Sequence, residues 1–150
     1  MSRLLPPGRY GCDAVAPEDR IETGRHTVTA AEIDGFAALS GDRFEIHMSD
    51  TAAKSHGFPG RVAHGLLVLS LVDGLKNRAP AQLKAIASLG WDWSFRRPVF
   101  IGDEIGATIT VEAKRTVTKP DRGILTLAFD VTNQRGETVQ SGTNLLLAYR

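Results

Sequence analysis

One short segment of the chain holds the residue types best suited to proton transfer. Asp42 and His47 lie close together in the run Ser-Gly-Asp-Arg-Phe-Glu-Ile-His, residues 40–47. A carboxylate and an imidazole that reach the same water can share general-base and general-acid duties when their protonation states are complementary. The segment therefore indicates a proton-transfer pair, although the same residues also fit a surface aspartate and a loop histidine with no catalytic role.

Gly65 adds a second chemical feature, at a position where a helix is expected to begin. The first turn of a helix carries unpaired backbone N–H groups and a partial positive charge, and glycine lets a ligand oxygen approach them closely. Such donors stabilise the enolate oxygen that forms when a thioester is polarised. Together with Asp42 and His47, this glycine suggests a site for thioester chemistry.

The element before Asp42 is predicted to be a helix with a defined start and end. Thr29 and Glu32 have the spacing of a capping box, in which each side chain accepts a hydrogen bond from the other residue's backbone N–H. The helix is expected to run toward Ser40, where Gly41 can end it in the left-handed conformation. Asp42 would then begin a loop directly after a rigid element.

A second helix is predicted at Ala63–Asn77, and its composition is unusual. An ordinary surface helix has one apolar stripe, whereas this stretch is apolar on nearly every side. It is therefore expected to be a central, buried helix. Its apolar residues are Leu66, Leu67, Val68, Leu69, Leu71, Val72 and Leu75.

The rest of the chain alternates apolar and polar residues with the period of half-buried strands. Turn residues at 120–123 and 133–136 join the later strands into consecutive antiparallel hairpins. Trp91 and Trp93 share one face and are expected to be core residues. The predicted fold is α+β, a curved antiparallel sheet wrapped around the buried helix. The expected strands are residues 25–28, 89–95, 105–111, 125–131 and 138–149.

The length of 150 residues fits a single domain, expected over residues 25–150. Residues 1–24 are rich in proline and glycine without a sustained period, which predicts an extended N-terminal arm lying over the fold. A small sheet of this kind leaves edges and part of one face unprotected. We therefore expect a homodimer or a higher oligomer built from dimers.

The charge balance excludes some classes of partner. With 18 Lys and Arg against 17 Asp and Glu and no long block of either sign, neither a nucleic acid nor a membrane is expected as a partner. Cys12 is the only cysteine, so an intrachain disulfide is excluded and a reducing compartment is favoured. The N-terminus lacks the apolar stretch of a signal peptide, and a cytoplasmic location is expected.

The order and spacing of three motifs resemble the MaoC-like dehydratase family, which includes the R-specific enoyl-CoA hydratases. The first motif is Ser-Gly-Asp-x4-His, which ends at His47. The second is Gly-Arg-Val-Ala-His-Gly at residues 60–65, and the third is the loop Phe-Arg-Arg-Pro-Val-Phe-Ile-Gly-Asp at residues 95–103. The resemblance runs from about residue 27 to the C-terminus, which is far more specific than a lone Asp and His.

This resemblance implies a hot-dog fold, a dimer, and hydration of trans-2-enoyl-CoA to (R)-3-hydroxyacyl-CoA or the reverse dehydration. It implies that Asp42 and His47 bind and activate the water, and that the backbone N–H of Gly65 holds the thioester oxygen. Neither a metal nor a cofactor other than the coenzyme A of the substrate is implied. Which of the two residues is the base stays open, with Asp42 favoured.

The chain departs from the family inside the first motif. Phe44 and Glu45 stand where the family usually has Asn and Pro, and a phenylalanine side chain offers no hydrogen bond. Phe44 and His64 are predicted to contact the substrate, although a histidine at a helix entry also fits a purely structural hydrogen bond. His47, His56 and His64 lack the spacing of a recognised zinc motif, so no metal site is expected.

Two other functions fit parts of the pattern. A hot-dog acyl-CoA thioesterase would use a water and a carboxylate in a similar pocket, but it does not account for the Asp-x4-His loop. A non-catalytic acyl-CoA-binding domain would account for Phe44, but not for the retention of both Asp42 and His47. The acyl chain cannot be read from the residues, and short, medium, branched and dicarboxylic chains all stay open.

Overall fold

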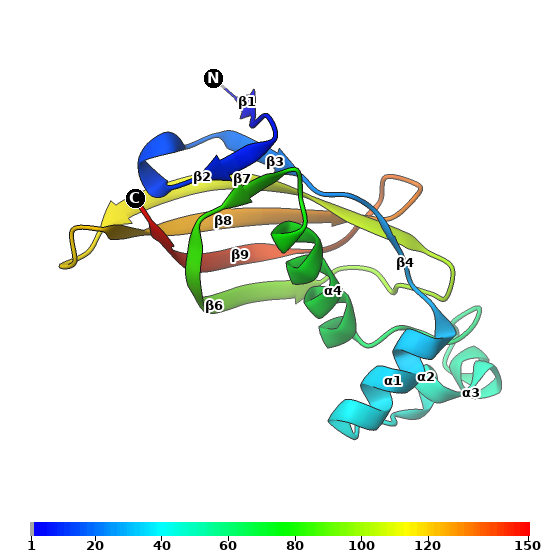
Figure 1. Ribbon diagram of the computed structural model, residues 1–150. Helices are drawn as coiled ribbons and strands as arrows, with labels where there is room; N and C mark the ends of the chain where they lie inside the picture. Colours follow the sequence, from blue (N-terminus) through cyan, green and yellow to red (C-terminus); the bar gives the residue numbers. More distant parts are fainter. Residues whose placement is uncertain (1) are drawn as a thin grey trace.

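A long, mainly antiparallel sheet forms the body of the protein in the computed structural model, which describes residues 2–150. Its strands follow the order β1-β3-β7-β8-β9-β6, and β4 also pairs with β7 (Figure 1). A separate two-stranded ladder joins β2 and β5. The strands are β1 (Arg3–Leu4), β2 (Gly8–Tyr10), β3 (Asp19–Glu22), β4 (His26–Thr27), β5 (Ala81–Leu83), β6 (Ala85–Phe95), β7 (Glu104–Thr116), β8 (Arg122–Thr132) and β9 (Thr138–Tyr149).

The apolar helix α4 (Gly65–Asn77) packs on this sheet and supplies its side of the core (Figure 1). It begins two residues later than predicted, because the preceding backbone is held in extended form: the Ala63 N–H donates to the Val99 carbonyl at 2.7 Å. The helix is also less enclosed than its composition predicts. Leu66 is 60% exposed, so one of its apolar faces is open in the single chain.

Three further helices lie beyond one end of the sheet: α1 (Ala30–Ser40), α2 (Glu45–Met48) and α3 (Asp50–Ser55). The predicted capping box of α1 is confirmed, since Thr29 accepts from the Glu32 N–H while Glu32 accepts from the Thr29 N–H. Gly41 ends the helix with φ 78°, as predicted. The short helices α2 and α3 occupy a stretch that was expected to be a loop. Over the described residues, no helix is long and apolar enough to cross a bilayer.

The N-terminal residues differ from the expected arm. Instead of only lying over the fold, they contribute β3, which pairs antiparallel with β7, and β1, which extends the sheet alongside β3. A short 3-10 turn, η1 (Cys12–Ala14), lies between β2 and β3. Several apolar residues of this segment also belong to the hydrophobic core. They are spaced too widely to show a period, so the sequence pattern did not indicate them. These residues are Leu5, Cys12, Val15 and Ile21.

The four long strands were predicted correctly as elements, and so were the hairpins that join β7 to β8 and β8 to β9. Trp91 and Trp93 pack against Phe129 and the core, as expected. The partner of β6 was not predictable from the turns: it is β9, the last strand, and the register shifts between Ala85 and Ala87 and again between Ser88 and Gly90. This pairing places β6 at an edge of the sheet.

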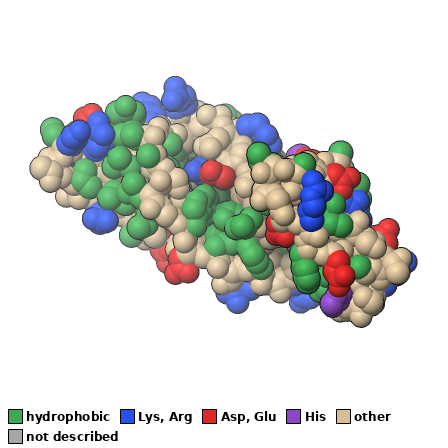
Figure 2. Space-filling model, turned by 90° about the horizontal axis from the view of Figure 1, so that it is seen from below, with side chains coloured by type: hydrophobic (Ala, Val, Ile, Leu, Met, Phe, Trp, Pro, Cys, Tyr) green, Lys and Arg blue, Asp and Glu red, His purple; other side chains and the backbone are tan. Residues whose placement is uncertain are grey.

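The edge formed by β6 exposes much apolar surface. The face seen from below, the side on which β6 lies in Figure 1, shows many hydrophobic side chains gathered together (Figure 2). Exposed apolar patches of this kind are typical of protein interaction surfaces. The exposed large hydrophobic residues of β6, α4 and β9 are Leu66, Leu89, Phe95, Leu145 and Tyr149.

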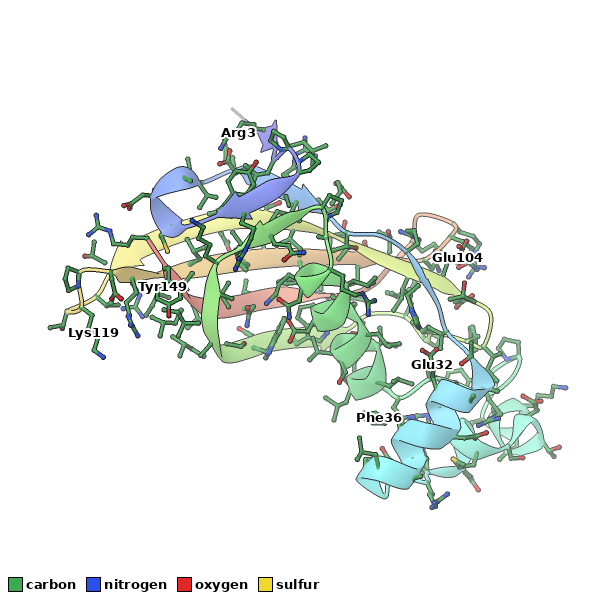
Figure 3. The ribbon with its side chains drawn as sticks, in the orientation of Figure 1. Arg3, Glu32, Phe36, Glu104, Lys119 and Tyr149 are labelled. Carbon is green, nitrogen blue, oxygen red and sulfur yellow. The ribbon has the colours of Figure 1, made fainter. Side chains whose placement is uncertain are left out.

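An ion pair fixes the N-terminal strands, far from Glu32 and Phe36 on α1 (Figure 3). Arg3 Nη2 donates to Asp19 Oδ2 at 2.8 Å, and the Ala16 N–H donates to the same oxygen at 2.9 Å. The hydrogen bond from Arg3 holds the pKa of the buried Asp19 carboxyl below its usual value, although burial acts in the opposite direction. The charged form of Asp19 therefore stabilises the folded state.

Replacing Asp19 with Asn is expected to lower the free energy of unfolding by about 1–3 kcal/mol near neutral pH, since a hydrogen bond to a charged group is lost. The difference in the free energy of unfolding between wild type and the variant should be at its full size above the unfolded-chain pKa of about 3.9. It should vanish as the pH falls through the lower folded-state pKa of Asp19. Urea unfolding across acidic pH measures it. Asp121→Asn, which breaks an exposed ion pair with Arg122, should change little. A pH-independent effect of Asp19→Asn contradicts this account.

Candidate active site

A pocket of about 470 Å³ lies where α2, the start of α4 and the end of β6 meet. Its wall is largely apolar and includes two histidines and two arginines. Residues of the three sequence motifs are thus brought to one place from separate parts of the chain. The lining residues are Asp42, Ile46, His47, Phe58, Val62, Ala63, His64, Gly65, Leu66, Val68, Phe95, Arg96, Arg97, Pro98 and Val99.

Asp42 is held by its backbone and by one carboxylate oxygen. Its N–H donates to Ser40 Oγ at 3.1 Å, and its Oδ1 accepts from the Phe44 N–H at 3.2 Å. The Asp42 carbonyl accepts from His64 Nε2 at 2.9 Å. These contacts fix the turn that follows α1 while the exposed carboxylate keeps capacity to accept a hydrogen bond from a water or a substrate.

His47 is buried, 8% exposed, and lies on the helical turn α2 rather than on the loop that was expected. Its Nδ1 is 2.6 Å from the Val62 carbonyl oxygen. Because a carbonyl only accepts, Nδ1 carries the hydrogen of the neutral ring, and Nε2 is left for a water or a substrate. The His47 carbonyl in turn accepts from Arg61 Nε at 2.6 Å, and Arg61 is ion-paired with Asp34.

His64 is 2% exposed and forms the N-cap of α4. Its ring stacks on that of His47, with centroids 3.9 Å apart and an interplanar angle of 24°, and its other neighbour is Phe36. Nε2–H donates to the Asp42 carbonyl, while Nδ1 is buried without a hydrogen-bond partner among residues 2–150. The contact between His64 and the substrate stays a prediction. What the geometry establishes is a link between the two residues of the proton-transfer pair.

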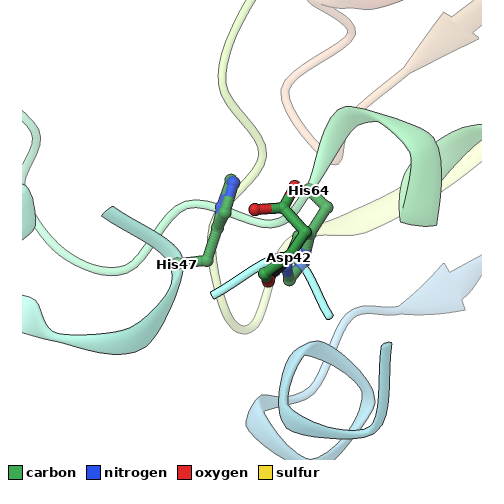
Figure 4. Close-up of side chains that lie close together, drawn as sticks. All are labelled: Asp42, His47 and His64. Carbon is green, nitrogen blue, oxygen red and sulfur yellow. Dashed lines mark hydrogen bonds between the residues drawn. The ribbon is translucent and has the colours of Figure 1, made fainter. Parts of the chain in front are cut away.

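Asp42, His47 and His64 converge, with one ligand-type atom of each lying within 4.8 Å of the others (Figure 4). The set resembles a possible metal centre, but its geometry does not suit one. A histidine ligand points a ring nitrogen at the metal within the plane of the ring, and two stacked rings direct their nitrogens along nearly parallel planes that do not meet nearby. The residues suit a bound water better than a shared ion.

Gly65 is the first residue of α4, and the helix begins without a side-chain cap. The N–H groups of the first turn have no partner within a helix, so a ligand oxygen can take that place. The glycine is also required by packing, because a Cβ here would lie 2.4 Å from Phe95 Cε2. Gly65 therefore combines an available backbone donor with close contact to an aromatic ring of the pocket wall.

Replacing Gly65 with Ala is expected to lower the free energy of unfolding by about 1–3 kcal/mol through overpacking against Phe95. Gly74→Ala, in the same helix, is the matched control. A Cβ at Gly74 meets only Arg78 Nη1 at an ordinary 3.8 Å, so that change should be neutral or stabilising. Urea unfolding of both variants, and of Gly65→Ala combined with Phe95→Ala, measures the contact. A cost that persists when Phe95 is truncated contradicts the packing explanation.

Phe44 does not line the pocket, although it was predicted to contact the substrate. Its side chain is 54% exposed and its ring lies edge-on to His47, with centroids 6.1 Å apart, and near His56. Its backbone N–H, which any residue but proline supplies, is what binds Asp42. The family's asparagine is thus replaced by a residue that covers the outer side of His47.

Sequence reasoning missed several residues that position the site. The Val62 carbonyl accepts from the His47 ring, and the Arg61 side chain donates to the His47 carbonyl. Each contact involves a main-chain oxygen, which no residue pattern reveals. Gln140 was also missed, although a buried amide on a predicted core face is a signal that could have been noticed. It lies on β9 and donates to the Gly65 carbonyl at 3.0 Å.

Comparison with known proteins gives a consistent result. The model of the MaoC like domain family matches residues 13–132. The (R)-specific enoyl-CoA hydratase of Aeromonas caviae is 37% identical over 115 residues, which cover 75% of this chain and 81% of that protein. The MaoC-like dehydratase of Rhodospirillum rubrum has a solved structure with a TM-score of 0.81 and 30% identity, covering 94% of this chain and 97% of that one.

A protein of Mycobacterium tuberculosis described as having a double hot-dog fold also superposes on this chain. The TM-score is 0.79 at 19% identity, over 91% of this chain and 43% of that one. At this level of identity the likeness concerns the fold alone. The expectation of a hot-dog fold is therefore confirmed.

Proposed function

The chain belongs to the MaoC-like domain family and is an enzyme of the hydratase and dehydratase type, and on that premise we propose that it is an (R)-specific enoyl-CoA hydratase. The reaction adds water to a trans-2-enoyl-CoA, or removes it from the (R)-3-hydroxyacyl-CoA. The observation that carries the proposal is the placement of Asp42, the free Nε2 of His47 and the first turn of α4 around one pocket.

The proposed chemistry balances without a metal or a further cofactor. Asp42 and His47 hold a water and take one proton from it while its oxygen bonds to the β-carbon of the enoyl group. The electrons of the carbon–carbon double bond move toward the thioester, whose oxygen gains negative charge and is stabilised by the Gly65 N–H. A proton returned by the pair to the α-carbon completes the hydroxyacyl product.

The division of labour between the two residues follows the positions of their free atoms. The Asp42 carboxylate is exposed at the pocket and can only accept a proton when ionised, whereas His47 Nε2 can accept or, once protonated, donate. We favour Asp42 as the base toward water. The proton that Asp42 takes from water passes to His47 Nε2, and His47 then returns it to the α-carbon, while Nδ1 stays anchored on the Val62 carbonyl and keeps the ring oriented.

The pocket supports an acyl-CoA substrate. Apolar side chains of Ile46, Phe58 and Val68 offer an environment for an acyl chain, and Arg96 and Arg97 also line the pocket. Guanidinium groups are suited to the phosphates of coenzyme A. The length and branching of the acyl chain depend on how far this wall extends and are part of what an assay must determine.

We also propose that the working form is a homodimer that pairs through the side of β6. This strand is eleven residues long and stands at an edge of the sheet, next to the exposed Leu66 and Phe95. A long edge strand with exposed apolar residues is expected to be covered by another chain. Sedimentation equilibrium should give a mass of twice 16.2 kDa or a multiple of it. A monomer at micromolar concentration contradicts this.

The function is tested by incubating the pure protein with trans-2-enoyl-CoA esters of several chain lengths. Loss of the conjugated thioester absorbance without release of free thiol is expected. Thiol release without hydration would instead favour the thioesterase alternative. Binding with neither signal would favour a non-catalytic acyl-CoA-binding domain.

A further inference from the structure

A partly buried chain of hydrogen bonds connects the sheet to the first residue of α4. Trp93 Nε1–H donates to Gln140 Oε1 at 2.8 Å, and Gln140 Nε2–H donates to the Gly65 carbonyl at 3.0 Å. Gln140 is 2% exposed. An indole N–H can only donate, so it fixes which end of the amide faces Trp93 and directs the NH₂ group toward Gly65.

The surroundings of this chain are shaped to fit it. Gln140 stands directly opposite Phe95 in the pairing of β6 with β9. Phe95 contacts Gly65 from one side while Gln140 holds its carbonyl. Beside them, Gly142 leaves room for Trp93, because a Cβ there would lie 2.8 Å from Trp93 Cε3 and 2.1 Å from the Asp92 carbonyl.

The first turn of α4 needs such an anchor. His64, at the N-cap, gives the turn no side-chain hydrogen bond because its ring is directed to the Asp42 carbonyl. Gly65 has no side chain of its own and its backbone is intrinsically permissive. Without Gln140, the peptide groups that flank Gly65 would be fixed by main-chain contacts alone.

We infer that Gln140, oriented by Trp93, is a positioning residue that aims the Gly65 N–H at the thioester oxygen of the substrate. The inference rests on the proposed function, because it assigns to Gly65 the oxygen of the enoyl thioester. Gln140 does not touch the substrate. It holds the peptide group that follows Gly65, and through the Gly65 Cα this restrains the preceding peptide group, which carries the N–H donor. A displacement of this donor by a fraction of an ångström weakens the stabilisation of the developing enolate.

The test compares Gln140→Leu with Asn144→Leu. Asn144 is a fully buried amide on the same strand, and its side chain donates to Ser88 Oγ and the Gly90 carbonyl, away from Gly65. Both variants lose buried hydrogen bonds and should be destabilised alike. Gln140→Leu should lower kcat for hydration about 10- to 100-fold with KM little changed, whereas Asn144→Leu should stay within about threefold of wild type.

A second readout does not depend on hydration. Butyryl-CoA has no carbon–carbon double bond in its acyl chain and cannot be hydrated. The infrared stretching band of its carbon-13-labelled thioester carbonyl therefore reports polarisation by the Gly65 N–H without turnover. Wild type and Asn144→Leu should shift the band to lower frequency relative to free butyryl-CoA. Gln140→Leu should lose most of the shift while the ligand stays bound. Trp93→Phe, which keeps an aromatic ring but removes the N–H donor, should lose part of it.

The outcomes separate this inference from the proposed function. Wild type that shifts the band but does not hydrate enoyl-CoA contradicts the proposed function and leaves the positioning role supported if Gln140→Leu loses the shift. An unchanged shift in both Gln140→Leu and Trp93→Phe overturns the inference even if wild type hydrates. Absence of a shift in wild type overturns it as well, since Gly65 would not hold the carbonyl.

Discussion

Asp42→Asn is expected to lower kcat for hydration of trans-2-enoyl-CoA by about 10²- to 10⁴-fold, the usual cost of removing a general base or acid. The amide is nearly isosteric and its oxygen can still accept from the Phe44 N–H, so the turn after α1 should be preserved. What it loses is the negative charge and the ability to take a proton from water. Steady-state kinetics with absorbance detection measure the loss.

The matched control for Asp42 is Asp13→Asn. The Asp13 side chain is 63% exposed and pairs with Arg150 away from the pocket. This variant should keep wild-type kinetics. If the kcat of Asp42→Asn, like that of Asp13→Asn, stays within a few-fold of wild type, the assignment of Asp42 as the base is wrong.

His47→Asn is the second change with a large expected effect, again about 10²- to 10⁴-fold in kcat. The asparagine amide can donate to the Val62 carbonyl, as Nδ1 does in wild type, and so replaces the structural half of the histidine. It has no counterpart of the ionisable Nε2. Activity should therefore fall while the free energy of unfolding changes little.

Two comparisons sharpen the result for His47. His47→Ala should be as inactive as His47→Asn but less stable, because the buried Val62 carbonyl then lacks its donor. His56→Asn should retain activity, since His56 is exposed and pairs with Glu45 outside the pocket. A His47→Asn variant that is stable and fully active contradicts the proposed role of Nε2.

The parts of the fold that depend on local pattern were predictable. The capping box of Thr29 and Glu32 and the left-handed Gly41 are encoded within a few residues, and the structure confirms both. Alternation likewise predicted the long strands. These features place Asp42 directly after a rigid helix, which is why its position could be anticipated.

The parts that depend on distant partners were not predictable. The pairing of β6 with β9 joins segments that are separated by two hairpins. The contribution of β1 and β3 to the sheet comes from short strands without a visible period. His47 was placed on a loop because the four-residue helix α2 is too short to show a helical pattern.

The site shows the same division. Residue types suggested Asp42, His47 and Gly65, and the structure brings all three to one pocket. The contact of His64 with the Asp42 carbonyl and that of Gln140 with the Gly65 carbonyl involve main-chain atoms, which the sequence does not display. The position of Phe44 could not be predicted from the sequence either, since its ring lies edge-on to His47 outside the pocket.

We propose that Asp42 and His47 add water to the acyl chain and leave the thioester intact. Reaction of trans-2-butenoyl-CoA in oxygen-18 water, followed by mass spectrometry of the products, locates the new oxygen directly. One heavy oxygen is expected on the β-carbon of a 3-hydroxybutyryl group still attached to coenzyme A, and none with the variant that combines Asp42→Asn and His47→Asn. Heavy oxygen found only in the carboxylate of a released acid, with free coenzyme A, would contradict it.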